Sequence, residues 1–148
     1  MLQKGLIALL LLLLAACAGQ PSKPVVDLPL LQLKAAQLPG AVVDGAPGVT
    51  ISYPDERLFG VRAALPMPGG PAVLDPLARL LVEFPAAHWR GMVRCKSGLG
   101  EDYDRQLVAK RLELLQRYLS RKGVGPAAVA WQSEIGPGAS LELVLKRP

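Results

Sequence analysis

The sequence predicts an α/β sandwich in which two helices pack on one face of a four-stranded sheet, in the order β-α-β-α-β-β. Three observations support this prediction. Short segments of alternating apolar and polar residues are typical of half-buried strands, and two longer segments with apolar residues at helical spacing are typical of helices. Proline and glycine clusters separate these segments, as turns require. The folded domain is expected to span residues 49–148.

The first strand and the first helix are expected in the first half of this domain. Residues 49–53 alternate with an apolar residue at every second position, which predicts a strand. Residues 72–84 carry apolar side chains at helical spacing. Because proline fits the start of a helix, we expect Pro76 in the first helical turn, with Asp75 as a possible N-cap.

The second half of the domain holds one strand, the clearest helix and two final strands. His88 to Cys95 alternate again, which predicts the second strand. Residues 104–122 form one long apolar stripe, and Gly123 is a natural stop for that helix. The alternating segments 127–132 and 141–146 predict the last two strands. Both helices therefore connect strands and can cover the same face of the sheet.

The first residues of the chain predict export. Met1 to Leu14 combine one cation, Lys4, with an unbroken apolar run that is too short to span a bilayer as a mature helix. Residues 1–16 are therefore expected to be a signal peptide. The segment Leu14-Ala15-Ala16-Cys17 also resembles a bacterial lipobox. Alternatives are an ordinary signal peptide with a cysteine near its cleavage site, or an uncleaved anchor helix.

The lipobox resemblance implies a lipid anchor. In that family the cysteine thiol takes a diacylglycerol and the new amino terminus is acylated, which here implies that Cys17 binds membrane lipid. More than one chain gives stable anchoring without a membrane-spanning helix. Ala18 follows the cysteine, where the family's signal for retention in the inner membrane is an aspartate, so the resemblance implies the outer membrane with the domain facing the periplasm.

Residues 17–48 are expected to be a flexible tether. This stretch is rich in proline and shows no sustained period of 3.6 or 2. A structured role for Val25 to Leu38, docked on the domain or on a partner, is the alternative. The tether is long enough to hold the domain away from the membrane.

Charge and composition exclude several classes of function. The net charge of +5 is mild, and an exported protein does not meet chromosomes, so no nucleic-acid partner is expected. The single histidine, His88, has no partner at a catalytic spacing and is expected at the surface, so we expect no enzyme, no metal site and no cofactor. Cys95 is expected to be a small buried residue, with a reactive free thiol as the alternative.

Two segments resemble the OmpA-like C-terminal domain, a periplasmic module that associates with peptidoglycan. The first segment includes Leu58-Phe59 and the helix that begins Ala72-Val73-Leu74-Asp75. The second matches the family's long helix at Tyr103-Asp104, Leu107-Val108, Arg111-Leu112, Leu115 and Tyr118-Leu119. The resemblance covers nearly all of the expected domain, from Val49 to Leu145, and implies the same α/β sandwich.

The resemblance also implies a ligand, the diaminopimelate of an uncrosslinked wall peptide. In the family an arginine of the second helix binds the ligand's carboxylate, and Arg111 stands at that position. An exposed helix arginine without a ligand is the alternative. The family's aspartate for the ligand's amine lies fifteen residues earlier, where this chain has Lys96. A cation cannot play that role, and Glu101, Asp102 or Asp104 would have to replace it.

Two functions of different class follow. In the first, an outer-membrane lipoprotein binds peptidoglycan noncovalently through a groove that contains Arg111 and links the envelope to the wall. In the second, the domain has lost that ligand and binds a protein of an envelope assembly, with Arg94 and Lys96 facing an acidic partner. Asp104 is expected to be either a ligand contact or the N-cap of the second helix.

Overall fold

The computed structural model describes residues 25–146 of the chain. The expected signal peptide, residues 1–16, and the expected lipidation site, Cys17, lie outside the described residues. Within residues 25–146, no helix has both the length and the apolar character that crossing a membrane requires.

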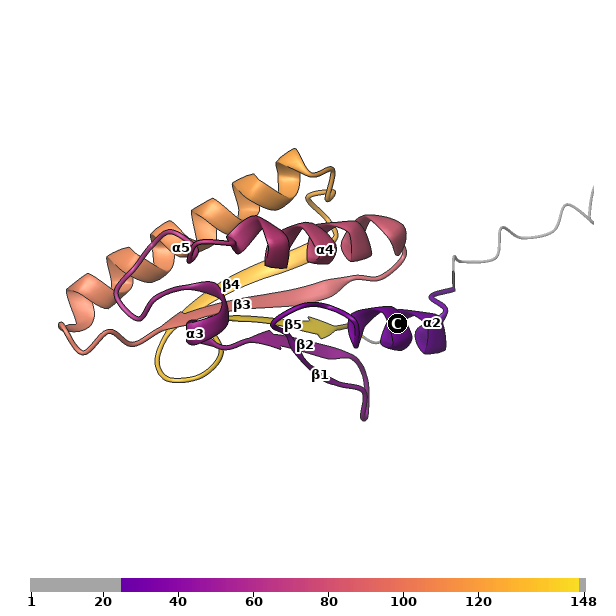
Figure 1. Ribbon diagram of the computed structural model, residues 1–148, viewed down its shortest axis with the longest axis horizontal. Helices are drawn as coiled ribbons and strands as arrows, with labels where there is room; N and C mark the ends of the chain where they lie inside the picture. Colours follow the sequence, from indigo (N-terminus) through magenta and orange to yellow (C-terminus); the bar gives the residue numbers. More distant parts are fainter. Residues whose placement is uncertain (1–24, 147–148) are drawn as a thin grey trace, which may run out of the picture.

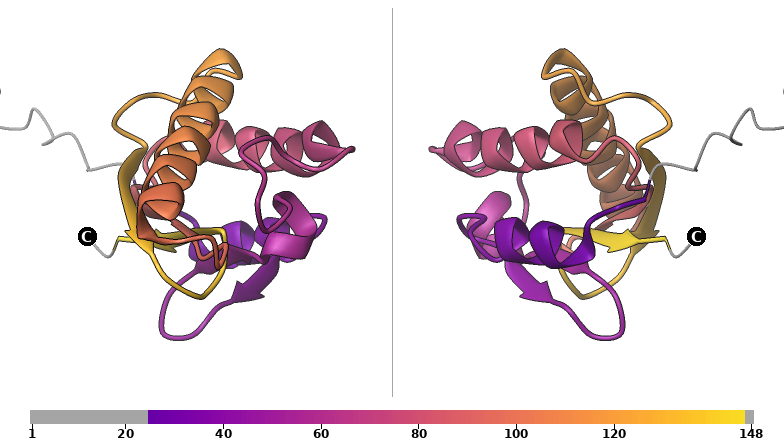
Figure 2. Two further views of the ribbon diagram at one scale, coloured as in Figure 1. Left: turned by 90° about the vertical axis from the view of Figure 1, so that its left-hand side faces the viewer. Right: turned by 90° about the vertical axis from the view of Figure 1, so that its right-hand side faces the viewer.

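The described elements form one mixed sheet with helices on one of its faces (Figures 1 and 2). In chain order they are α2 (Leu28–Ala35), β1 (Val42–Asp44), β2 (Thr50–Tyr53), α3 (Asp55–Leu58), α4 (Gly70–Glu83), β3 (Trp89–Cys95), α5 (Glu101–Arg121), β4 (Val129–Ile135) and β5 (Leu141–Leu145). The two long helices α4 and α5 cover the sheet, and α2 lies on the same side, between α4 and the β1–β2 side of the sheet (Figure 2). The predicted α/β sandwich is confirmed.

The sheet has five strands in the order β1-β2-β5-β3-β4, so the expectation of four strands is wrong. The additional strand β1 pairs antiparallel with β2 at the edge, with Val42 opposite Ser52. The last strand, β5, lies in the centre between β2 and β3. Only β3 and β4 run parallel, because α5 connects them as a crossover helix.

The alternation of β3 is confirmed, and it explains one glycine. Trp89, Val93 and Cys95 are buried on the helix-covered face of the sheet. Gly91 lies on that same face opposite Trp131 of β4, and a Cβ atom there would come within 2.7 Å of the Trp131 ring. The missing side chain therefore makes room for the indole on the sheet.

Helix α2 corrects the expected tether. Leu31 and Ala35 are completely buried and belong to the same apolar core as the sheet and the long helices. Asp27 caps the helix by accepting a hydrogen bond from the Leu30 N–H, 3.1 Å away. Pro29, which looks like an interruption in the sequence, occupies the first helical turn, where a missing N–H costs nothing. A flexible tether over residues 28–44 is therefore wrong, and the structured alternative is confirmed.

Helix α4 begins earlier than expected and assigns Asp75 a different role. Gly69, with a φ of 92°, precedes the helix, so Pro76 lies inside it and Asp75 is not its N-cap. The Asp75 carboxylate instead accepts a hydrogen bond from the hydroxyl of Tyr118 and pairs with Lys122 at 2.9 Å. These contacts hold the two long helices together. They also lower the pKa of Asp75, chiefly through the hydrogen bonds from Tyr118 and Lys122.

Candidate functional site around Arg111

Arg111 lies in the middle of α5 and has no exposed surface. It stands four residues after Leu107 and four before Leu115, both buried, so it projects from the core-facing stripe of the helix. The alternative of an exposed helix arginine is therefore wrong. A buried guanidinium requires partners for its charge and for its N–H groups.

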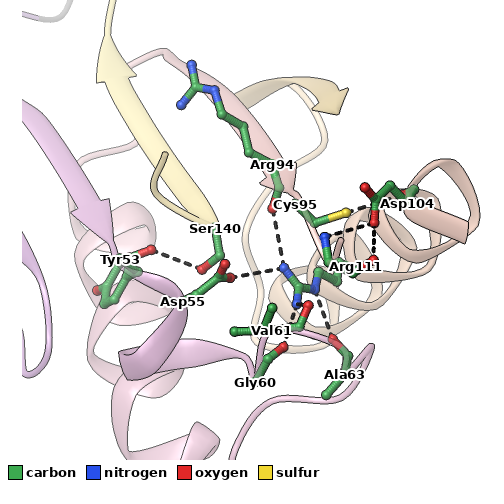
Figure 3. A network of polar contacts seen from close by, with 11 residues as sticks. Tyr53, Asp55, Gly60, Val61, Ala63, Arg94, Cys95, Asp104, Arg111 and Ser140 are labelled. Carbon is green, nitrogen blue, oxygen red and sulfur yellow. Dashed lines mark hydrogen bonds and ion pairs between the residues drawn. The ribbon is translucent and has the colours of Figure 1, made fainter. Parts of the chain in front are cut away.

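All five N–H groups of the guanidinium have an acceptor within the chain (Figure 3). Nε donates to the Ala63 carbonyl at 2.9 Å. Nη1 donates to Asp55 Oδ1 at 3.1 Å and to the Arg94 carbonyl at 3.3 Å. Nη2 donates to the Gly60 carbonyl at 2.6 Å and to the Val61 carbonyl at 3.5 Å. The Arg111 side chain therefore joins α5, β3, α3 and the loop that follows α3.

The loop after α3 is held in place largely by this side chain. Three of its carbonyls, between Gly60 and Ala63, accept from Arg111. The ring of Phe59 lies beneath the guanidinium, 4.7 Å from the charged carbon to the ring centroid. The Met67 N–H then donates to the Leu58 carbonyl at 2.9 Å and closes the loop. Arg111 thus fixes a surface loop from below.

Asp55 supplies the negative charge. It is the first residue of α3, where a carboxylate is favoured by the helix dipole, and its side chain keeps 25% of its surface exposed. Burial raises the pKa of Asp55 above its ordinary value, and the charge and hydrogen bond of Arg111 partly offset this rise. The pair therefore neutralises the buried cation.

Lys96 and Asp104 come together in a separate hollow. The hollow measures about 460 Å³ and lies between the turn that precedes α5 and the loop that follows β4. Lys96 is exposed at its edge, and Gly98 and Gly100 form part of its wall. Arg111 lies on the same face of α5 as Asp104 but does not line the hollow, because its guanidinium is directed toward Asp55 and the loop after α3 (Figure 3). The three residues predicted to bind a ligand therefore do not share one cavity.

Asp104 is not the N-cap of the second helix, which corrects that alternative. The helix begins at Glu101 after Gly100, so Asp104 lies in its first turn. Its carboxylate accepts hydrogen bonds from the N–H of Ser97, at 2.9 Å, and from the Ser97 hydroxyl. These bonds, and to a lesser degree the charges of Lys96 and Arg111, lower the pKa of Asp104. The carboxylate closes the turn between β3 and α5.

Replacement of Asp104 by asparagine should therefore change the pH dependence of stability. A carboxyl with a lowered pKa in the folded state stabilises the fold above its ordinary pKa of ~4, and this contribution is lost as the pH falls through the lowered value. We expect Asp104→Asn to have a lower free energy of unfolding than wild type at pH 7, and the difference between the two proteins to become smaller toward pH 2. Urea unfolding at both pH values measures this difference.

The matched control for this prediction is Asp102→Asn. Asp102 lies in the same helical turn but is exposed and pairs with the also exposed Arg105 on the helix surface. Its stability difference from wild type should be small at both pH values. A gap for Asp104→Asn that stays constant from pH 7 to pH 2 would contradict the assigned role of the Asp104 charge.

The remaining candidates have structural roles. Cys95 is buried, and its thiol donates to the Asp104 carbonyl at 3.3 Å, while burial raises the pKa of the thiol. This confirms the expected small buried residue. His88 is exposed, as expected. Arg94 pairs with Glu134 and Glu142 of the neighbouring strands at 2.9 and 3.3 Å, and its contact with an acidic partner stays a prediction. Residues 25–146 contain no cluster of ligands that could hold a metal ion.

Sequence reasoning missed Asp55 and the carbonyls of the loop after α3. Asp55 lies 56 positions before Arg111, and the Pro54-Asp55-Glu56 segment looks like a simple end to the strand before it. No local pattern marks an ion pair over such a distance. The only available signal was Phe59, part of the OmpA-like signature, whose ring lies under the Arg111 guanidinium.

Comparisons with known proteins identify the fold. No protein-family model matches the chain, and no curated protein matches its sequence. Among solved structures, a putative MotB-like protein from Desulfovibrio vulgaris is 19% identical, with a TM-score of 0.58 over 82% of this chain and 88% of that one. The OmpA-like domain of FopA1 from Francisella tularensis is 14% identical, with a TM-score of 0.51 over 72% of this chain and 81% of that one. The chain has the OmpA-like fold.

A third structural neighbour is the cell wall anchor of the T6SS from Pseudomonas aeruginosa. It is 10% identical, with a TM-score of 0.59 over 84% of this chain and 98% of that one. At these identities the likeness concerns the fold. At the two positions that the sequence resemblance assigns to a ligand pair, Arg111 is buried and Lys96 is exposed.

Proposed function

We propose that this chain is a non-catalytic lipoprotein of the cell envelope, anchored in the outer membrane by acylated Cys17, whose OmpA-like domain binds a protein partner within an envelope assembly in the periplasm. The observation that carries the proposal is the state of Arg111. The arginine that would bind the carboxylate of a wall peptide is completely buried, and Asp55 and four backbone carbonyls take all of its N–H groups.

A wall peptide would have to displace groups of this chain to reach Arg111. Its carboxylate would compete with Asp55 at Nη1, and the loop between Gly60 and Ala63 would have to leave its hydrogen bonds. Each lost bond to a charged donor costs about 1.5–3 kcal/mol. Lys96 at the aspartate position would also repel the ligand's ammonium group. Both halves of the family's recognition scheme are therefore unfavourable here.

The position of α2 supports a partner close to the membrane. Only seven residues, 18–24, separate Cys17 from residue 25, and the eight Cα–Cα steps between these two residues span at most about 29 Å. Helix α2 packs against the domain through the buried Leu31 and adds no reach. In Figure 1, α2 and the first residues of α5 lie at opposite ends of the molecule. The end of the domain that carries Lys96, next to the start of α5, would therefore face away from the anchor.

Peptidoglycan association is the second candidate function. Two observations favour it: the fold shared with a protein described as a cell wall anchor, and the hollow beside Lys96. In this alternative the exposed Lys96 ammonium would bind a carboxylate of the wall peptide, a reversal of the family's charge pattern. Asp104 would contribute little, because Ser97 already occupies its carboxylate.

Sedimentation with purified peptidoglycan separates the two candidates. The chain beginning at residue 18 is incubated with insoluble wall material, and we expect it to stay in the supernatant because neither charge of the family's pair is available. Saturable sedimentation that free diaminopimelate prevents would overturn the proposed function. Sedimentation lost in Lys96→Ala but retained in Lys146→Ala, another exposed lysine, would locate the contact at the Lys96 hollow.

The lipid anchor is tested separately. Cells that express the full chain are grown with radiolabelled palmitate, and the label is expected in the wild-type protein and absent from Cys17→Ser. Cys95→Ser is the matched control, because Cys95 is buried and should not be acylated. Label that persists in Cys17→Ser, or its absence from the wild type, would refute the anchor without affecting the conclusions on Arg111.

A further inference from the structure

A groove lies between α5 and the loop that leads into α4, and neither Lys96 nor Arg111 lines it. It measures about 660 Å³. One wall is the loop and first turn of residues 64–71, and the other is the second half of α5, from Lys110 to Arg121. We call it the α4–α5 groove. None of the residues predicted from the sequence to bind a ligand lines it.

The floor of the α4–α5 groove is apolar and partly uncovered. Leu65 is 69% exposed and Met67 is 42% exposed, and Pro66, Leu74 and Leu114 complete the apolar lining. Adjacent exposed apolar side chains in a hollow are a mark of binding surfaces in soluble domains. Arg111 and the bridge between Phe59 and Pro66 fix the loop that carries them. The surface is therefore preorganised, which lowers the entropic cost of binding.

The α5 side of the groove carries a straight row of cations. Lys110, Arg117 and Arg121 are separated by seven and four residues, which places them within about 40° of one another around the helix and over about 16 Å along its axis. Glu113 pairs with Arg117. Within residues 25–146, neither Lys110 nor Arg121 forms an ion pair with an acidic side chain. The row therefore presents positive charge in excess.

We infer that the α4–α5 groove binds an acidic amphipathic segment of a partner protein, with its apolar residues on Leu65 and Met67 and its carboxylates on the row of cations. This inference rests on the proposed function and gives the partner's chemistry. The chain's own residues 18–24 do not fit the groove, because they contain Lys23 and no acidic residue. A flat anionic membrane could meet the cations but could not fill the apolar floor of a hollow.

The charge spacing defines the partner segment further. Carboxylates on one helical face at positions i, i+7 and i+11 would match the row on α5, with leucines on the adjacent face over the floor. Charge complementarity along such a row steers association and selects one orientation of the segment. The apolar contacts would contribute most of the affinity, as in other helix-in-groove complexes.

A designed peptide tests this inference. The probe is a fluorescein-labelled 18-residue amphipathic peptide with glutamates at i, i+7 and i+11 and leucines on the adjacent face. Its binding to the full chain, held in neutral phosphatidylcholine nanodiscs, is followed by fluorescence anisotropy. We expect saturable binding, with the dissociation constant raised at least about tenfold when glutamine replaces the three glutamates.

Variants of the chain locate the site. Lys110→Glu combined with Arg121→Glu, and separately Leu65→Ser, should each weaken binding about tenfold or more; these side chains are exposed and their replacement should leave the fold intact. Arg90→Glu is the matched control, an exposed cation outside the groove, and should change binding less than about twofold. Equal binding by all variants, or no binding, overturns the inference.

Two further outcomes also overturn it. Binding of the wild type, but not of Lys110→Glu/Arg121→Glu, to phosphatidylglycerol vesicles without any peptide binding would assign the groove to a membrane surface. A concentration-dependent dimer that Leu65→Ser dissolves would assign it to a second copy of the chain. The proposed function is tested by the peptidoglycan assay, in which the contact residue is Lys96. The present inference is tested by the peptide assay, in which the contact residues line the α4–α5 groove. A failure of one can therefore be distinguished from a failure of the other.

Discussion

Replacing Arg111 by methionine is expected to lower the free energy of unfolding by about 3–5 kcal/mol. Methionine fills a similar volume but leaves three loop carbonyls, the Arg94 carbonyl and the Asp55 carboxylate without their donor. Urea unfolding followed by tryptophan fluorescence measures the loss. The effect is large because one side chain connects α5 to three other parts of the fold.

Arg105→Met is the matched control for this prediction. Arg105 is in the same helix and makes ion pairs with Glu101 and Asp102, but its side chain is 60% exposed. Such exposed pairs contribute about 0.3–0.5 kcal/mol. A loss below about 1 kcal/mol for Arg111→Met would contradict the burial of this side chain. It would mean that the guanidinium is available to a ligand, and the wall-peptide candidate would gain support.

Leu31→Ala in α2 is expected to lower the free energy of unfolding by about 2–5 kcal/mol. The Leu31 side chain is completely buried in the common core, next to Ala35 of the same helix. Its truncation removes apolar burial and leaves a cavity. If α2 were part of a flexible tether, the same substitution would have no measurable effect. Urea unfolding of the chain beginning at residue 18 again gives the value.

Leu33→Ala provides the matched control in the same helix. Leu33 is 61% exposed, so its truncation should change stability by no more than about 0.5 kcal/mol. Equal effects of the two substitutions would show that α2 does not dock as described. The chain between Cys17 and the domain would then be longer, because α2 would be part of the tether, and the domain could act farther from its membrane.

Local patterns in the sequence were sufficient for most of the architecture. The period of 2 in β3 and the period of 3.6 in α5 are local properties of the chain, because burial on one face imposes them residue by residue. The fold class could therefore be predicted. Helix α2 could not, since its stabilisation comes from burial of Leu31 against distant segments and Pro29 hides the helical period.

The candidate site shows the same limit more sharply. The OmpA-like motif was sufficient to select Arg111 and Lys96 as unusual positions, because motif spacing is also a local property. Whether Arg111 meets a ligand or the chain itself depends on Asp55, which is 56 positions away and reaches the guanidinium only after the sheet and helices have packed.

The sequence by itself thus determined four of the five strands, the long helices and the departure at Lys96 from the family's ligand pair. Only the tertiary structure decided that Arg111 is neutralised internally, that α2 belongs to the core, and that the apolar groove beside Lys110 is open. The physical reason is that a side chain loses its hydrating water when it is buried, and groups from distant parts of the chain must then take over its hydrogen bonds and balance its charge. A local pattern does not encode that exchange.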